Sequence, residues 1–137
     1  MNYLLDTNAC IALLNSRPPQ VGVRLQEVWA RGATVSLSSI VLHELFYGAA
    51  KSARRKTNSE AIISLLQQTF EVLQFDLDAA RESGEIRALL ERKGQRIGEY
   101  DTLIAGQALA RGLTLVTANT REFARVNGLK VVDWTRW

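Results

Sequence analysis

The chain alternates between short apolar runs and longer segments in which apolar residues recur every three or four positions. Short apolar runs favour buried strands, whereas the longer spacing favours amphipathic helices. The pattern predicts strands at residues 2–6, 33–37, 72–75, 113–117 and 130–134. It predicts helices at residues 8–14, 20–31, 39–50, 58–70, 77–93 and 101–111. Strands that alternate with helices predict a mainly parallel central sheet covered on both faces, which is a three-layer α/β/α fold.

Length and composition predict one ordinary globular domain. The chain has 137 residues, of which 47% are hydrophobic and 23% charged, and it contains no repeat or linker-like segment. We therefore expect residues 1–137 to form a single domain. No apolar stretch approaches the roughly 20 residues of a membrane helix, and residues 1–6 lack the basic start of a secretory signal. We expect a cytoplasmic protein that makes no membrane contact.

Charge is a weak guide to the partner. The net charge of +3 is consistent with a polyanionic partner such as nucleic acid. Basic residues gather in two places, at Lys51 with residues 54–56 and at residues 92–96. Such clusters are also typical of solvated helix faces, so both interpretations stay open at this point.

Three acidic residues lie in apolar surroundings in distant parts of the chain. Asp6 ends one apolar run, Glu44 stands in the middle of another, and Asp101 opens a helix whose next turn is apolar. Unpaired charges are rarely tolerated on buried faces, and three acids together would repel one another unless a cation held them. The pattern therefore predicts a metal site, although any one of these acids alone could cap a helix or pair with a buried arginine.

The predicted sheet topology brings these residues to one edge. Functional sites of open α/β sheets form outside the carboxyl ends of the strands. Asp6 and Asn119 each follow a predicted strand, and Glu44 and Asp101 can reach the same edge from helices. Oxygen ligands without histidine or cysteine favour Mg²⁺ or Mn²⁺ over zinc.

Phosphodiester hydrolysis is the chemistry that this set of residues suits. A bound metal lowers the pKa of a water and neutralises charge on the phosphate. We expect the catalytic and metal-binding residues to be Asp6, Glu44 and Asp101, with Asn119 acting through a water. Asn8 and Thr117 are the candidates for orienting the carboxylates.

Several other polar residues have less chemical promise. His43 is the only histidine, so a pair of histidines acting as acid and base is excluded. Cys10 is the only cysteine and has no neighbouring histidine, which indicates a buried, inert thiol. We assign Glu99 and Asp133 to the surface. Glu122 stays open between a role through water at the site and simple solvent exposure.

Taken together, the motifs resemble a known family. They are the segments Leu4–Asn8, Leu42–Leu45, Ile97–Ala105 and Leu115–Asn119, and the end of the chain, residues 121–134, extends the match. They resemble the PIN domain and, more narrowly, the VapC ribonuclease toxins of bacterial toxin–antitoxin pairs. An isolated Asp-Thr-Asn is a weak signal, whereas four motifs in this order are specific.

The resemblance implies a set of roles and partners. The three acidic family positions fall on Asp6, Glu44 and Asp101, and the fourth, often Asp, falls on Asn119, which leaves the site one charge poorer. The segment 120–123 is similar to the branch that cuts initiator tRNA in the anticodon loop. The resemblance also implies a homodimer and a VapB-type antitoxin whose tail lies over the cleft, with DNA contacted only through that antitoxin.

Two other classes of function stay open on the residues alone. A non-catalytic module could use the acidic pocket to bind a basic peptide and the basic surface to bind RNA without cutting it. A DNA-directed nuclease is equally compatible with the carboxylates, because the metal chemistry does not require the 2′-hydroxyl.

Overall fold

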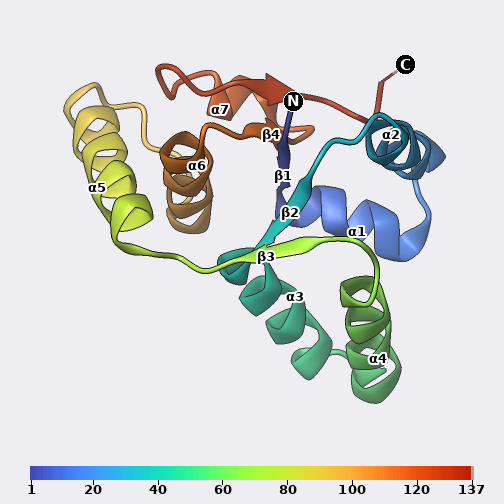
Figure 1. The fold of residues 1–137 in the computed structure, drawn as a ribbon. Helices are drawn as coiled ribbons and strands as arrows, with labels where there is room; N and C mark the ends of the chain where they lie inside the picture. Colours follow the sequence, from blue (N-terminus) through green and yellow to red (C-terminus); the bar gives the residue numbers. More distant parts are fainter. Residues whose placement is uncertain (137) are drawn as a thin grey trace.

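A five-stranded, all-parallel sheet forms the centre of the computed structural model, which describes residues 1–136 (Figure 1). The strands lie in the order β3-β2-β1-β4-β5. Their bounds are β1 Tyr3–Leu5, β2 Val35–Ser38, β3 Glu71–Leu73, β4 Thr114–Val116 and β5 Val131–Val132. The predicted parallel sheet is confirmed, and the first strand of the chain lies at its middle.

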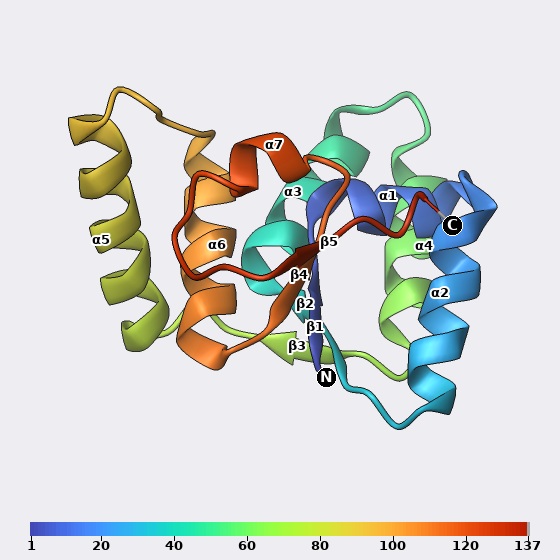
Figure 2. The same cartoon turned by 90° about the horizontal axis from the view of Figure 1, so that it is seen from above.

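Helices cover both faces of this sheet, as the three-layer prediction requires. Their bounds are α1 Thr7–Asn15, α2 Pro19–Ala30, α3 Ser39–Lys51, α4 Arg55–Leu66, α5 Leu77–Arg92, α6 Glu99–Arg111 and α7 Thr120–Phe123. Figure 2 shows α5 and α6 on one side of the sheet and α1, α2 and α4 on the other. No helix within residues 1–136 is both long and apolar enough to cross a membrane.

The core explains why the strands are so short and so apolar. Leu4, Leu5, Leu37 and Leu115 are completely buried, as expected for strands covered on both faces. Register aligns the strand ends, because Leu5 pairs with Leu37 on one side and with Val116 on the other. The residues that follow β1, β2 and β4 therefore emerge at the same edge of the sheet.

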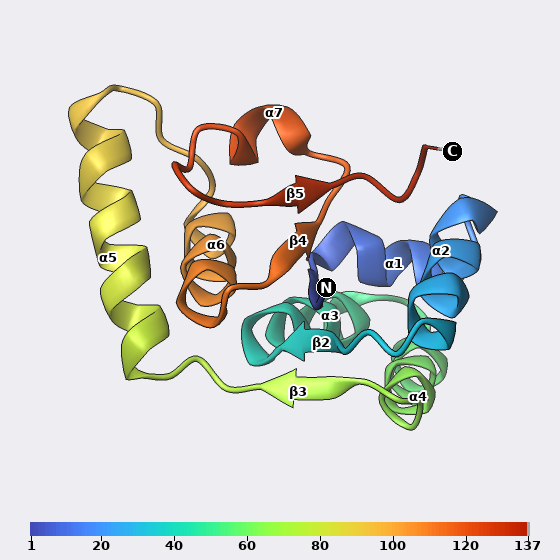
Figure 3. The same ribbon diagram turned by 45° about the horizontal axis from the view of Figure 1, so that its top comes forward.

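Helices α5 and α6 pack more closely than ordinary side chains allow (Figure 3). A Cβ atom added at Gly106 would lie 2.6 Å from backbone and side-chain atoms of Ser83. Glycine is therefore required at this crossing. The close contact fixes α6, whose first turn carries Asp101, against the rest of the fold.

Apart from shifts of one or two residues at the ends of other elements, such as the strand predicted at residues 130–134 that spans only Val131–Val132, the structure differs from the predicted elements in two places. The helix predicted at residues 58–70 runs from Arg55 to Leu66 instead. After this helix the chain turns at Gln67, and the Phe70 ring packs on Trp29 of α2 with centroids 5.0 Å apart, which is a tertiary contact that the apolar pattern does not predict. The short helix α7 was not predicted at all, because four residues are too few to display a helical period.

Candidate active site

Asp6 lies where β1 ends and α1 begins, and the local structure holds it tightly. Its backbone N–H donates to the carbonyl of Val116 at 3.0 Å, and its Oδ1 accepts from the N–H of Ala9 at 2.8 Å. The residue is only 4% exposed. Burial raises the pKa of Asp6 and the charge of Glu44 adds to the rise, against the opposing effect of hydrogen bonds from the Thr117 hydroxyl and Ala9. A buried carboxylate is thus placed at the carboxyl edge of the central strand.

Glu44 reaches the same region from α3. The Thr7 hydroxyl donates to its Oε1 at 2.6 Å, which ties the side chain to the first residue of α1. Glu44 is half-buried, on the side of α3 that also carries the buried Val41. The helical pattern that predicted an inward-facing acid is consistent with this placement.

Asp101 lies in the first turn of α6, where burial and the charges of other acids affect its pKa. Burial is the largest cause of the rise in its pKa to about 6. The negative charges of Asp6, Glu44 and Glu122 add to the rise, in that order. A Cβ atom at Gly98 would lie 3.1 Å from Oδ2 of Asp101, so the glycine leaves room for the carboxylate. The carboxylates of Asp6, Glu44 and Glu122, which come from distant parts of the chain, therefore lie near enough to Asp101 to raise its pKa.

Asn119 and Glu122 form a linked pair beside this group. The Asn119 amide Nδ2 donates to Glu122 Oε2 at 2.7 Å, and the Asn119 backbone N–H donates to the Thr117 hydroxyl at 2.9 Å. Thr117 is buried and also hydrogen-bonds Asp6. Glu122, left open on sequence grounds, is thus half-buried and electrostatically coupled to Asp101. In the sequence, the spacing of three residues between Asn119 and Glu122 could have indicated that the two side chains meet. That inference requires a helical turn between them, and the short helix α7 was not predicted.

The remaining candidates fall in different places. Asn8 is exposed, and within residues 1–136 no hydrogen bond joins its side chain to the carboxylates. Glu99 is exposed, as expected. The surface prediction for Asp133 is wrong, because its side chain is only 13% exposed and accepts hydrogen bonds from the Thr135 backbone and hydroxyl. Burial alone would raise the pKa of Asp133, but these hydrogen bonds and Arg136 lower it.

The donor set suits a hard divalent cation. Every candidate donor is an oxygen, and within the described chain none of Asp6, Glu44 and Asp101 forms an ion pair with an arginine or lysine. Burial and neighbouring acids raise the pKa of Asp6 and of Asp101, and a cation would relieve the repulsion among these charges. In residues 1–136 no group of three or more acidic, histidine or cysteine side chains has an arrangement that could hold a metal ion.

The basic cluster of Lys51 and residues 54–56 is exposed at the end of α3 and the start of α4. The Lys51 ammonium lies 4.8 Å from the centre of the Tyr47 ring, and this tyrosine is itself exposed. A cationic and aromatic surface of this kind is compatible with a nucleic-acid contact and equally with a solvated face. Its role stays a prediction.

Nearly the whole chain is similar to known proteins of one family. Residues 3–129 match the model of the PIN domain. The tRNA(fMet)-specific endonuclease VapC of Shigella flexneri is 42% identical over 135 residues, which cover 98% of this chain and 99% of the relative. Ribonuclease VapC2 of Rickettsia felis is 39% identical, with 99% and 100% covered. The crystal structure of VapBC2 from Rickettsia felis bound to a DNA fragment from their promoter superposes with a TM-score of 0.90, at 39% identity, covering 98% of this chain and 99% of that one.

Proposed function

Because the chain belongs to the VapC family of PIN-domain ribonucleases, we propose that it is a metal-dependent endoribonuclease and the toxin of a type II toxin–antitoxin pair. The observation that carries the proposal is the raised pKa of Asp101, about 6, which follows from burial beside other acids. Repulsion among partly buried carboxylates is costly unless a cation binds them. We further propose that residues 1–137 form one domain.

The proposed catalytic residues are Asp6, Glu44 and Asp101, which also bind the metal, with Asn119 acting through a water. Divalent-metal dependence is typical of the family, and we propose Mg²⁺ or Mn²⁺ because all the donors are oxygens. When bound, the ion lowers the pKa of a water and neutralises charge on the phosphate.

The protein's own contribution is to hold the carboxylates in place. The N–H of Ala9 and the Thr117 hydroxyl fix Asp6, and the Thr7 hydroxyl fixes Glu44. Such fixed partners limit the reorganisation that the site needs during reaction.

The fourth carboxylate is supplied by a different residue from the one that the family pattern suggested. Asn119 stands at the usual acidic position, and it donates to Glu122. We propose that Glu122 restores the missing negative charge and accepts a proton from an attacking water, while Asn119 orients it. The half-buried position of Glu122 and its coupling to Asp101 support this role.

The substrate and partners follow from the relatives. The Shigella flexneri relative is named for tRNA(fMet), so we propose initiator tRNA, cut in the anticodon loop, as the substrate in the cytoplasm. The Rickettsia felis structure holds the VapBC2 complex on promoter DNA. We accordingly propose a VapB-type antitoxin as partner, a homodimeric toxin, and DNA contact only through the antitoxin.

The test is cleavage of purified tRNA by the antitoxin-free protein. We expect cutting that requires Mg²⁺ or Mn²⁺, stops with EDTA, and falls about 100-fold or more in Asp101→Asn, because a group that stabilises the transition state is lost. Asp78→Asn is the matched control, since Asp78 is exposed in the first turn of α5 and should leave cleavage unchanged.

Two results would contradict the proposal. Full activity of Asp101→Asn with Mg²⁺ present would remove this residue from the reaction. Failure of the unsubstituted protein to cut any RNA, while it still binds RNA or cuts DNA of the same sequence, would favour the non-catalytic module or the DNA nuclease.

A further inference from the structure

A cavity of about 340 Å³ lies between α5 and the start of α6, and its lining includes Tyr100 and Thr102, the two sequence neighbours of Asp101. Its volume falls in the range of roughly 300–1,000 Å³ that is usual for small-molecule pockets. The apolar part of its lining comes from Phe75, Leu90, Ile97 and Leu103. Nothing in the proposed reaction uses this space.

Tyr100 forms a wall of the cavity next to the proposed catalytic residues. It directly precedes Asp101 and is 44% exposed. Its ring lies 5.6 Å from the ring of His43, and its hydroxyl lies 3.4 Å from His43 Nε2. His43 in turn directly precedes Glu44. The tyrosine is therefore an aromatic ring on the cavity wall that is held against α3, the helix that carries Glu44.

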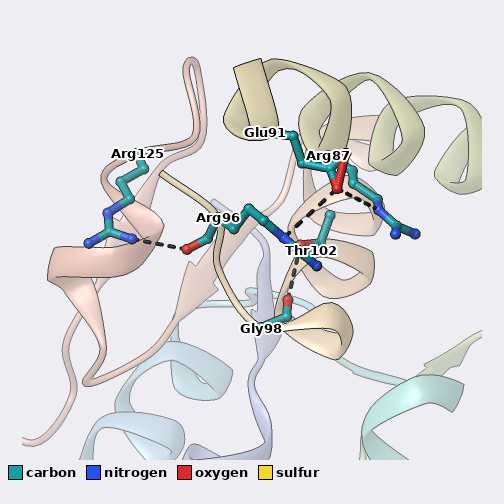
Figure 4. Close-up of polar contacts among 6 residues, drawn as sticks. All are labelled: Arg87, Glu91, Arg96, Gly98, Thr102 and Arg125. Atoms are coloured by element: carbon teal, nitrogen blue, oxygen red, sulfur yellow. Dashed lines mark hydrogen bonds and ion pairs between the residues drawn. The ribbon is translucent and has the colours of Figure 1, made fainter. Parts of the chain in front are cut away.

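Two arginines stand at the cavity and share one acidic partner (Figure 4). Oε2 of Glu91 lies 3.3 Å from Nε of Arg87 and 3.8 Å from Nε of Arg96. Both arginine side chains are more than 60% exposed, and exposed ion pairs contribute little free energy. Either guanidinium can therefore turn to a phosphate at small cost.

The loop that carries Arg96 is anchored on both sides. The Arg125 guanidinium donates to the backbone carbonyl of Arg96 at 3.1 Å, and the Thr102 hydroxyl donates to the carbonyl of Gly98 at 3.0 Å (Figure 4). Ile97 between them is buried. The rim is thus fixed before any ligand arrives, which lowers the entropic cost of binding.

Charge favours an anionic chain at this rim. Three arginines, Arg87, Arg96 and Arg125, stand there against two acids, Glu91 and Glu99. An occupant that combines a flat aromatic group with a neighbouring negative charge matches both the apolar lining and the cationic rim. A nucleotide in single-stranded RNA has this combination.

We propose that the cavity binds one unstacked base of the RNA substrate, which stacks on Tyr100 while the adjoining phosphate contacts Arg96 or Arg87. The inference rests on the proposed ribonuclease function and adds a base-binding site to it. Because Tyr100 adjoins Asp101, the bound base belongs to a nucleotide close to the cleaved bond. The cavity would thereby set which phosphate reaches the carboxylates.

The test compares intact and abasic RNA on matched variants. A short single-stranded RNA spans the mapped cleavage site, and a series of copies lacks one base at a time. Binding is measured in the Asp101→Asn background, which blocks cleavage. At one position, loss of the base should weaken binding about 10-fold, within the range for base–aromatic stacking. This penalty should disappear in Tyr100→Ala.

Control variants separate stacking from folding. Tyr100→Phe keeps the ring and should keep the abasic penalty. Leu77→Ala removes an exposed apolar side chain of α5 outside the cavity lining and should also keep it. In a plot of the logarithm of the binding constant against the logarithm of the salt concentration, Arg96→Ala should reduce the magnitude of the slope by about 0.7, the value for one lost phosphate contact on a single strand. Arg81→Ala, on an exposed part of α5 outside the cavity lining, should leave the slope unchanged.

Different failures are distinguishable. If the unsubstituted protein does not cut RNA, the proposed function fails. If it cuts RNA but the abasic penalty persists in Tyr100→Ala, or no position shows one, the base-binding site is wrong. If Tyr100→Ala weakens antitoxin binding or converts a dimer to a monomer without changing the abasic penalty, the cavity belongs to a protein interface and the proposal is overturned.

Discussion

Asp6 and Asp76 occupy the same kind of local position and have opposite electrostatic surroundings. Each caps a helix by accepting a hydrogen bond from the N–H three residues on, which belongs to Ala9 in one case and Ala79 in the other. The hydrogen bond from Ala79 and the guanidinium of Arg111, 2.8 Å away, lower the pKa of Asp76. Burial beside other acids raises the pKa of Asp6.

The difference between the two caps lies in the tertiary partner, not in the motif. The negative charge of Asp76 is paired with the guanidinium of Arg111 from the same chain, so Asp76 does not need an external cation. Asp6 has carboxylates for neighbours, and none of the ion pairs formed within residues 1–136 includes it. An acid that a fold leaves without a cation is a better candidate for function than an acid that caps a helix well.

The largest expected effect comes from exchanging each acid for its amide. Asn caps a helix about as well as Asp, so the substitution changes charge and preserves the cap. Asp6→Asn should reduce kcat/KM for RNA cleavage about 100-fold or more, whereas Asp76→Asn should leave it unchanged.

The effects of these two substitutions on stability should be the reverse of their effects on activity: Asp76→Asn should be the less stable variant. In EDTA, urea unfolding should show that Asp6→Asn is as stable as the unsubstituted protein or more stable, because a repelled buried charge is removed. Asp76→Asn should be slightly less stable, because it loses the ion pair with Arg111. If Asp6→Asn kept its activity, Asp6 would be a helix cap only, as Asp76 is, and its proposed catalytic role would be wrong.

A second prediction concerns a basic residue of the antitoxin, which would pair with the acidic group as Arg111 pairs with Asp76. An arginine or lysine from the antitoxin's C-terminal segment, placed near Asp6, Glu44 and Asp101, would pair with them and compete with Mg²⁺. Changing that residue to alanine should weaken inhibition at least about 10-fold. High Mg²⁺ should partly relieve inhibition by the unchanged antitoxin. Equal inhibition without any basic residue in the cleft would show a purely steric block.

A third, smaller effect should follow from moving a carboxylate without changing its charge. In Gly98→Ala the new Cβ would stand 3.1 Å from Oδ2 of Asp101, which must shift by a few tenths of an ångström. We expect kcat to fall several-fold, with little change in stability, since misplacement of about 1 Å can cost roughly 100-fold. Gly22→Ala, where a Cβ meets nothing within 4 Å, is the control and should retain full activity.

The smallest predicted effect is on the pH dependence of stability without metal. Because the pKa of Asp101 is raised to about 6 in the folded protein, the native state binds more protons than the unfolded chain between about pH 4 and 6. Asp101 should therefore lower the free energy of unfolding as pH rises through that interval. Asp76, with a lowered pKa, contributes stability that is lost at low pH.

Urea unfolding in EDTA at a series of pH values checks this expectation. Asp101→Asn should remove the part of the decline that lies between about pH 4 and 6, the interval set by the folded and unfolded pKa values. Saturating Mg²⁺ should remove it as well, because a bound cation keeps the carboxylate ionised. An identical pH profile for Asp101→Asn and the unsubstituted protein would contradict the electrostatic account.

The order of the strands and helices, and the three central acids, could be predicted from the sequence for a physical reason. A carboxylate at the end of an apolar run, as at Asp6, or within one, as at Glu44, conflicts with its surroundings, and that conflict is visible in the sequence alone. The parallel topology then sends such residues to one edge of the sheet.

The parts that the sequence did not reveal depend on tertiary contacts. Glu122 is placed by a helix of four residues and an amide from Asn119, neither of which produces a periodic pattern. Asp133 looked exposed because it is charged and lies near the end of the chain. Its side chain is instead only 13% exposed and accepts hydrogen bonds from the backbone and hydroxyl of Thr135, contacts that only the folded chain creates.

The hydrogen bonds that hold the acids also restrict how many oxygens each one can offer to an ion. One oxygen of Asp6 accepts from Ala9, and one oxygen of Glu44 accepts from Thr7. At least one oxygen of each carboxylate is therefore shared with a hydrogen-bond donor, which disfavours a two-oxygen grip at both positions. Ca²⁺ readily takes such bidentate carboxylates in shells of about 6–8 oxygens, whereas Mg²⁺ prefers single oxygens in an octahedron filled out by water. The same hydrogen bonds that hold Asp6 and Glu44 in place should thus make the site discriminate against the larger ion.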